Sequence, residues 1–256
     1  MSVPIRARAA VALGGSAVIG VAAFCWPLFV PAGGVSVEAP WLFALLLPLV
    51  LAVALAEISS GGMDAKAVAM LGVLSALGAA IRPLGAGTAG IETVFFLLVL
   101  GGRVFGPGFG FVLGNTMLFA SALLTGGIGP WLPYQMLASS WVGLGAGLLP
   151  AMRGRVELVV LAGYSAVASV VYGLLLNLSF WPFALSAGST SVSYVPGAPL
   201  GDNLVRLVGF SLATSLGWDV GRAVTTVVLV LVTGPVLLRT LRRAARKAAF
   251  TGSGLG

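Results

Sequence analysis

The 256-residue chain is 59% hydrophobic and only 8% charged, with a mean hydropathy of +1.08. A water-soluble core of this size does not need so much apolar surface, so lipid must be the solvent for most of the chain. The net charge of +7 is explained by basic residues that contact anionic lipid headgroups, and we expect no nucleic-acid binding.

Eight apolar windows follow one another along the chain. A spanning helix needs about 20 apolar residues, and the fourth window is short enough to predict a helix deep in the bundle or a re-entrant segment. The first window reads as a retained helix, because no clear signal-peptide cleavage site follows it. The sequence therefore predicts an all-α integral membrane protein with about eight transmembrane helices. The windows are 11–30, 41–58, 66–82, 92–103, 105–125, 133–150, 157–178 and 208–238.

The basic residues predict how these helices are oriented. Arg6 and Arg8 precede the first window, and a basic cluster follows the last. Because positive charges are retained on the cytoplasmic side, we expect a multi-pass protein of the plasma membrane with both termini in the cytoplasm. Three arginines fall outside this rule and need another explanation: Arg82, Arg206 and Arg222.

Several kinds of chemistry lack the residues they require. The chain has no His, one Cys and seven acidic residues, so no metal site of usual spacing, cofactor site or nucleophile–base pair can be assembled. Neither Lys66 nor Lys247 follows a phosphate-binding Gly-rich loop. We therefore do not expect an enzyme, and any ATP-driven transport must take its ATPase from another polypeptide.

Small residues recur at every fourth position in the third window. Gly72, Ala76 and Ala80 lie on one face of the predicted helix, and this spacing lets helices approach closely in lipid. The stripe fits packing inside the chain or docking on a partner equally well. Two further sets with this spacing are expected to pack internally: Gly102, Gly106, Gly110 and Gly114, and the pair Gly143 and Gly147.

Two charges interrupt the last window. Asp219 and Arg222 are three residues apart on one helical face, with Arg222 expected near the middle of the span. A charge at mid-bilayer costs about 2.5–3.5 kcal/mol on insertion scales. The two residues are interpreted either as an ion pair that fixes helix register or as the polar floor of a binding cavity, with Glu92 as another possible partner of Arg222.

Other polar and aromatic residues lie at the expected outer ends of the helices. Single interfacial Trp and Tyr residues often only anchor a helix, but several that converge predict a cavity for a bulky, partly planar organic solute. The connection 179–205 is long enough to fold over its mouth. The predicted ligand-binding residues are Arg82, Glu92, Asn115, Trp131, Tyr134, Gln135, Tyr172, Asn177, Trp181, Trp218, Asp219 and Arg222.

Several motifs together resemble a known family. They are the Ala76-x-x-x-Ala80 helix, the loop Arg82-Pro83-Leu84-Gly85-Ala86-Gly87, Glu92, the runs 101–108 and 124–136, and Gly217-Trp218-Asp219-x-x-Arg222-Ala223. Over roughly residues 64–240 the chain resembles the substrate-binding S components of energy-coupling-factor (ECF) vitamin transporters. No single motif in this set is highly specific.

The resemblance implies a division of the chain and a set of partners. Residues 61–240 would form a six-helix core that binds a vitamin near the outer face, after two additional helices in 1–60 and before a basic cytoplasmic tail in 241–256. The loop 83–92, the outer halves of the last three helices and the connection 179–205 would enclose the site. The stripe at Gly72, Ala76 and Ala80 would dock on a transmembrane T component that is coupled to two cytoplasmic ATPases. The resemblance leans towards the cobalamin branch of the family.

Three other readings stay open. A stand-alone secondary transporter or channel for a small organic solute is the principal alternative, although its usual mid-span carboxylate relay and inverted repeats are not evident. An integral-membrane enzyme would need a catalytic base or metal site that this chain lacks. A scaffold subunit without a ligand is also compatible with the sequence.

Overall fold

The described part of the chain is built from helices. The computed structural model describes residues 7–29, 39–58, 63–85, 90–184 and 190–249. Every regular element in these ranges is helical. The elements are α1 Ala7–Cys25, η1 Trp26–Phe29, α2 Ala39–Glu57, α3 Ala65–Ile81, η3 Arg82–Leu84, α4 Phe95–Phe105, α5 Pro107–Thr125, α6 Leu132–Leu148, α7 Gly154–Ala184, α8 Leu200–Thr214 and α9 Leu216–Ala249.

Several of these helices are suited to a bilayer. Within the described ranges, four helical stretches are long and apolar enough to cross a membrane: Ala65–Leu84, Pro107–Thr125, Gly154–Ala184 and Leu216–Arg246. α4 is apolar but has only 11 residues, which agrees with the short span expected there. An all-helical membrane protein is thus supported, whereas the count of eight spans, the orientation of the termini and the plasma membrane stay predictions.

One predicted window and one predicted connection differ from the structure. The window 208–238 is divided at Ser215 into α8 and α9, and the connection 179–205 contains the end of α7 and the start of α8. Side-chain hydrogen bonds hold the break in place. Ser215 Oγ donates to Asn177 Oδ1 at 2.9 Å, and Asn177 Nδ2 donates to Ser211 Oγ at 3.1 Å. A continuous apolar sequence does not reveal such a junction, because these polar contacts come from α7.

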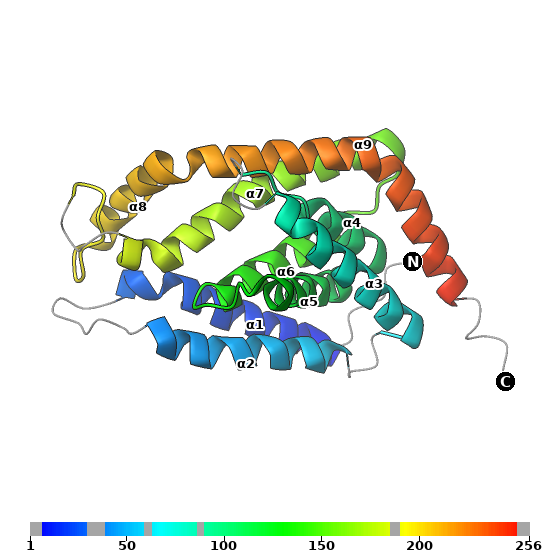
Figure 1. Ribbon diagram of the computed structural model, residues 1–256, viewed down its shortest axis with the longest axis horizontal. Helices are drawn as coiled ribbons and strands as arrows, with labels where there is room; N and C mark the ends of the chain where they lie inside the picture. The colour runs from blue at the N-terminus through cyan, green and yellow to red at the C-terminus, as the bar shows by residue number, and fades with distance from the viewer. Residues whose placement is uncertain (1–6, 30–38, 59–62, 86–89, 185–189, 250–256) are drawn as a thin grey trace.

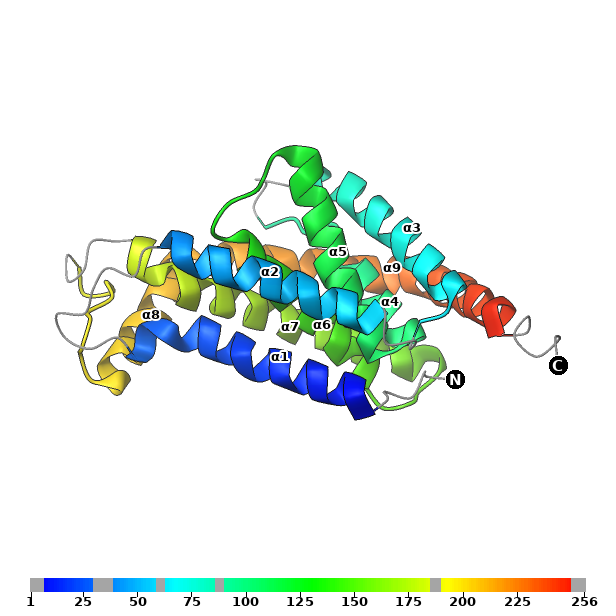
Figure 2. The same ribbon diagram turned by 90° about the horizontal axis from the view of Figure 1, so that it is seen from below.

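The helices pack around a central group. α7 and α9 run side by side along the longest axis of the molecule, while α3, α4, α5 and α6 pack against one another beneath them (Figure 1). α1 and α2 lie next to each other and cover α5, α6 and α7 on one side (Figure 2). The two N-terminal helices therefore pack directly on the proposed six-helix core instead of forming a separate body.

Glycines let three central helices approach closely. A side chain at Gly102 of α4 or Gly110 of α5 would collide with the carbonyl group of Gly143 in α6. Gly114 lies in the same way against the α6 backbone, and Gly147 against the turn before α5. The predicted internal packing of these glycines is confirmed, and it fixes the scaffold beneath the polar residues described below.

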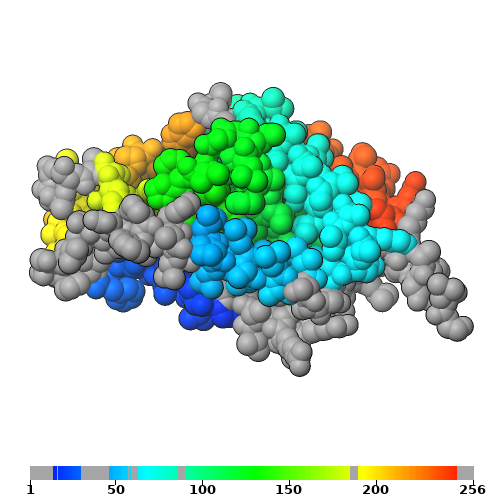
Figure 3. Space-filling model, turned by 60° about the horizontal axis from the view of Figure 1, so that its bottom comes forward, coloured from blue at the N-terminus to red at the C-terminus, as the bar shows by residue number. Residues whose placement is uncertain are grey.

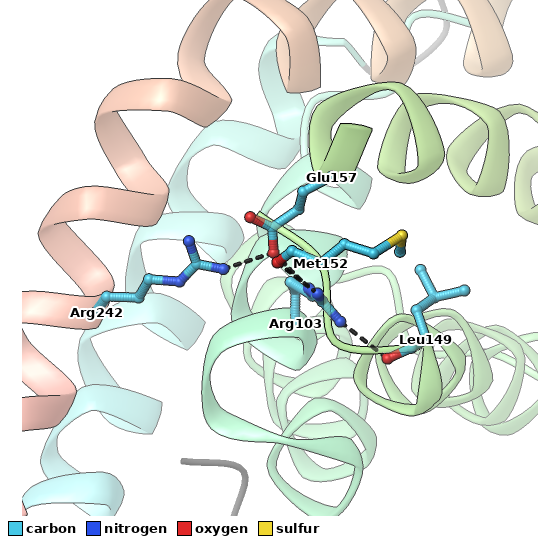
Figure 4. A network of polar contacts seen from close by, with 5 residues as sticks. All are labelled: Arg103, Leu149, Met152, Glu157 and Arg242. Carbon is cyan, nitrogen blue, oxygen red and sulfur yellow. Dashed lines mark hydrogen bonds and ion pairs between the residues drawn. The ribbon is translucent and has the colours of Figure 1, made fainter. Parts of the chain in front are cut away.

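A buried ionic network holds one end of the bundle (Figure 4). Arg103 Nε, near the end of α4, lies 2.7 Å from Glu157 Oε1 in the first turn of α7, and Arg242 Nη2 of α9 donates to the same oxygen. Arg103 also donates to the carbonyl oxygens of Leu149 and Met152, at 2.9 and 3.3 Å. The positive-inside pattern predicts a cytoplasmic location for Arg103 and Arg242, and the structure brings both to Glu157 at one end of the molecule.

Candidate functional site

A cavity of about 230 Å³ with a mixed polar and apolar lining opens where α3 ends, α5 ends and α9 begins. Its wall comes from the end of α3 with the turn and loop that follow, the last turns of α5 and the first turns of α9. These are the helix ends for which the orientation rule predicts an outer location. The polar and aromatic lining residues are Arg82, Glu92, Ser121, Thr125, Trp218 and Arg222.

Arg82 enters this wall where α3 ends. Pro83 lacks a backbone N–H and stops the α-helix, which continues only as the short turn η3. Arg82 Nη1 donates to Ser121 Oγ at 3.4 Å, and Arg82 Nη2 donates to Gln135 Oε1 at 3.3 Å. Both acceptors are neutral and both bonds are long, and among the described residues no ion pair includes Arg82. The guanidinium group is held by neutral partners, and Glu92 of the same wall acts on it electrostatically without a direct ion pair.

Arg222 has a much fuller set of partners. Its Nη1 lies 2.7 Å from Asp219 Oδ1 and donates to the Ser169 carbonyl oxygen at 3.1 Å. Its guanidinium carbon lies 4.9 Å from the centroid of the Tyr172 ring, in a cation–π contact. Gly173 is required opposite Asp219, because any side chain there would collide with the carboxylate. The predicted ion pair is confirmed. Arg222 also lines the cavity, whereas Asp219 does not and contacts it only through Arg222.

The depth expected for Arg222 is corrected by the break at Ser215. Because α9 begins at Leu216, Arg222 lies in its second turn, about 9 Å from the helix start at 1.5 Å per residue. A window that ran unbroken from 208 to 238 would have put it near mid-span. The ion pair is therefore close to one end of the helix, together with the other charges of the cavity.

Glu92 belongs to the segment that leads into α4. Its Oε1 accepts a hydrogen bond from the Val94 backbone N–H at 3.3 Å, and no ion pair of Glu92 is found among the described residues. Thr93 donates to the Ile81 carbonyl oxygen at 2.9 Å, which ties this segment to the end of α3. Gly90 adopts a φ of 76° and lies against the backbone of Trp218, where no larger residue fits. The segment is thus fixed between α3 and α9 with its carboxyl group at the cavity.

Four other predicted residues lie beneath or beside this wall. Tyr172 packs edge-on against Phe95 with ring centroids 4.8 Å apart, under Arg222. Gln135 accepts from Arg82, whereas Asn115 is fully buried and donates to Ser140 Oγ at 2.6 Å. Tyr134 is also buried, and its hydroxyl has no hydrogen-bond partner among the described residues. These side chains support the cavity and do not line it.

The remaining predicted residues lie elsewhere. Asn177 fixes the α8–α9 junction, and Trp131 is 43% exposed beside the start of α6. Trp181 is fully buried in a second apolar cluster at the end of α7, with Tyr194 and Phe210. The Tyr194 hydroxyl donates to the Pro27 carbonyl oxygen at 2.6 Å, and burial raises the pKa of this tyrosine, which keeps the donor protonated. This cluster joins α7, α8 and η1 and does not face the cavity.

The sequence analysis did not single out Ser121 and Thr125. They are four residues apart in the last turns of α5, next to Gly126, so both face the same side of the helix. Two polar side chains four residues apart at the end of an apolar helix were the sequence feature that could have predicted their place in the cavity wall.

Comparison of the chain with known protein families, with curated proteins and with solved structures finds no match. The resemblance to S components therefore rests on the motifs quoted above, and the function is argued from the site itself.

Proposed function

We propose that the chain is the membrane-embedded, substrate-binding subunit of an ECF-type ABC importer. It binds a vitamin or related small molecule at the extracellular side and delivers it through a T component driven by two cytoplasmic ATPases. The cobalamin-type ligand stays a prediction of the resemblance. A stand-alone secondary transporter for a small organic solute is the alternative.

The exposed stripe on α3 carries this proposal. Gly72, Ala76 and Ala80 are all exposed, whereas the residues of α3 that pack on the bundle are Leu71, Leu74, Ser75, Gly78 and Ala79. Nothing lies within 4 Å of a side chain built at Gly72. Figure 3 shows α3, in cyan, at the surface of the molecule. Internal packing, the other explanation of the stripe, uses the opposite side of the helix.

The position of the cavity adds to this support. Arg82, which lines it, directly follows α3, so the same helix carries a smooth exposed face and leads into a polar pocket. Small residues allow close helix–helix approach in lipid, where burial of apolar area alone does not drive association. A partner that docks on this face is therefore in contact with the helix that ends at the solute site.

The test is to place a large side chain in the stripe. Ala76→Trp and Ala80→Trp are expected to abolish uptake and co-purification with the T component, while ligand binding by the isolated subunit persists. Val167→Trp is a matched control, because Val167 is 63% exposed on the apolar surface of α7. Normal uptake by both stripe variants, or uptake by the chain expressed without a T component, would favour the secondary transporter instead.

A further inference from the structure

We propose that the cavity binds a small organic molecule that carries a carboxylate, which Arg82 holds, and an N–H donor, which Glu92 accepts. This inference rests on the proposed function, since it names the chemical class of the solute that the subunit would bind. It also differs from the cobalamin-type expectation, which came from the resemblance and not from the site.

The charged residues of the cavity wall indicate which groups a ligand needs. Arg222 is already matched by Asp219 at 2.7 Å, so this pair contributes little net charge to the cavity. Arg82 and Glu92 are both half-buried and line the same cavity, and among the described residues neither makes a direct ion pair. Each charge lies within electrostatic reach of the other, so the wall offers a cationic donor and an anionic acceptor side by side. A ligand with two complementary groups can hydrogen-bond to both.

The geometry around Arg82 favours a carboxylate. Ser121 and Gln135 each accept a hydrogen bond from one terminal nitrogen of the Arg82 guanidinium group. These two bonds orient the plane of the guanidinium group before a ligand binds. A planar guanidinium group binds a carboxylate through two parallel hydrogen bonds, and this arrangement adds both energy and orientation. Holding the fork in advance reduces the entropy that binding would otherwise cost.

Volume limits the size of the ligand. The cavity measures about 230 Å³, below the ~300–1,000 Å³ typical of pockets for drug-sized ligands. A corrinoid is larger than a drug-sized molecule, so a cavity of this size favours a one- or two-ring acid over a corrinoid. Trp218 and Ile91 supply an aromatic and an apolar surface for such a ring system.

The experiment uses matched pairs of probes and the full chain purified in detergent. Binding of biotin, pantothenate and 4-aminobenzoate, which all carry a carboxylate and an N–H donor, is measured by calorimetry and thermal shift. Each is compared with its own primary carboxamide, which has the same shape without the charge. Cobalamin and riboflavin complete the panel. The variants are Arg82→Gln, Arg82→Lys and Glu92→Gln, with Arg239→Gln as the control, because Arg239 is an exposed arginine of α9 near the ionic network.

At least one carboxylate is expected to bind, and its carboxamide to bind more than tenfold more weakly. Arg82→Gln should remove this preference for the carboxylate, and Arg82→Lys should keep part of it. Glu92→Gln should weaken the binding of the carboxylate and of its carboxamide by the same factor. The control should match the wild type. All variants are first checked for an unchanged size-exclusion profile.

Two results would overturn the inference. One is that no carboxylate of the panel binds, including the case in which cobalamin or riboflavin does; the other is that folded Arg82→Gln retains the full carboxylate preference. Either leaves the proposed function standing, since that function is tested separately by association with the T component through α3. A chain that binds a carboxylate through Arg82 but never associates with a T component would instead sustain the inference and remove the importer assignment.

Discussion

The ion pair between Asp219 and Arg222 allows a quantitative test of the cavity wall. We consider Arg222→Leu, Asp219→Ala and the double variant. The two side chains are only 13% and 9% exposed, so loss of the arginine leaves a buried carboxylate without its cation. Breaking one side of a buried pair costs about 3–5 kcal/mol. At about 2–4 °C per kcal/mol for chains of this size, Arg222→Leu should lower Tm by about 6–20 °C.

The double variant separates pairing from the other contacts of Arg222. It still loses the hydrogen bond to Ser169 and the contact with Tyr172, each contributing about 1 kcal/mol. It no longer contains an unmatched carboxylate, however, so we expect it to be more stable than Arg222→Leu alone. The coupling between the two substitutions should therefore be about 2–3 kcal/mol.

The assay is thermal unfolding in detergent without ligand, followed by tryptophan fluorescence, for the wild type and the three variants. Size-exclusion chromatography before heating establishes that each variant is folded and monodisperse. If the Tm loss of the double variant equals the sum of the two single losses, the residues are not coupled and our account of the wall is wrong.

Two further predictions concern the scaffold. Gly143→Val should lower Tm strongly or prevent folding, because the side chain would collide with the α5 backbone at Gly110, while Gly163→Val on the open surface of α7 should leave Tm unchanged in the same assay. Glu157→Gln should lower stability by about 3 kcal/mol, since it removes the shared carboxylate of the ionic network. Hydrogen exchange should then increase in α9 around Arg242, and unaltered exchange there would contradict a role for the network in holding that helix.

The sequence predicted the parts of this protein that depend on local pattern. The long apolar runs predicted helices, because in lipid every backbone N–H and C=O group must be hydrogen-bonded within its own segment. Four-residue spacing identified the glycines that pack inside, among them Gly102 and Gly143. The three-residue separation of Asp219 and Arg222 gave their ion pair, since both lie on one face of a single helix.

The sequence predicted less well which residues line the cavity. Arg82, Glu92, Trp218 and Arg222 were among the predicted residues, but Asn177 and Trp181 were chosen on the same grounds and lie elsewhere. Buried amides and aromatics near helix ends look alike in a sequence whether they line a cavity or join two helices. Only the packing of the end of α3 against the start of α9, distant in the chain, decides between these roles.

α9 connects the two polar regions of the molecule. Arg222 lines the cavity near the start of α9, and Arg242 joins the ionic network 20 residues further along the helix. Pro235 lies between them, and α9 bends before its C-terminal end (Figure 1). The apolar stretch between the two arginines lies mostly before this bend, so the straight part of α9 separates the cavity from the ionic network. Because α9 also packs on α7, whose Glu157 holds Arg242, the same pair of helices carries both the cavity wall and the ionic network.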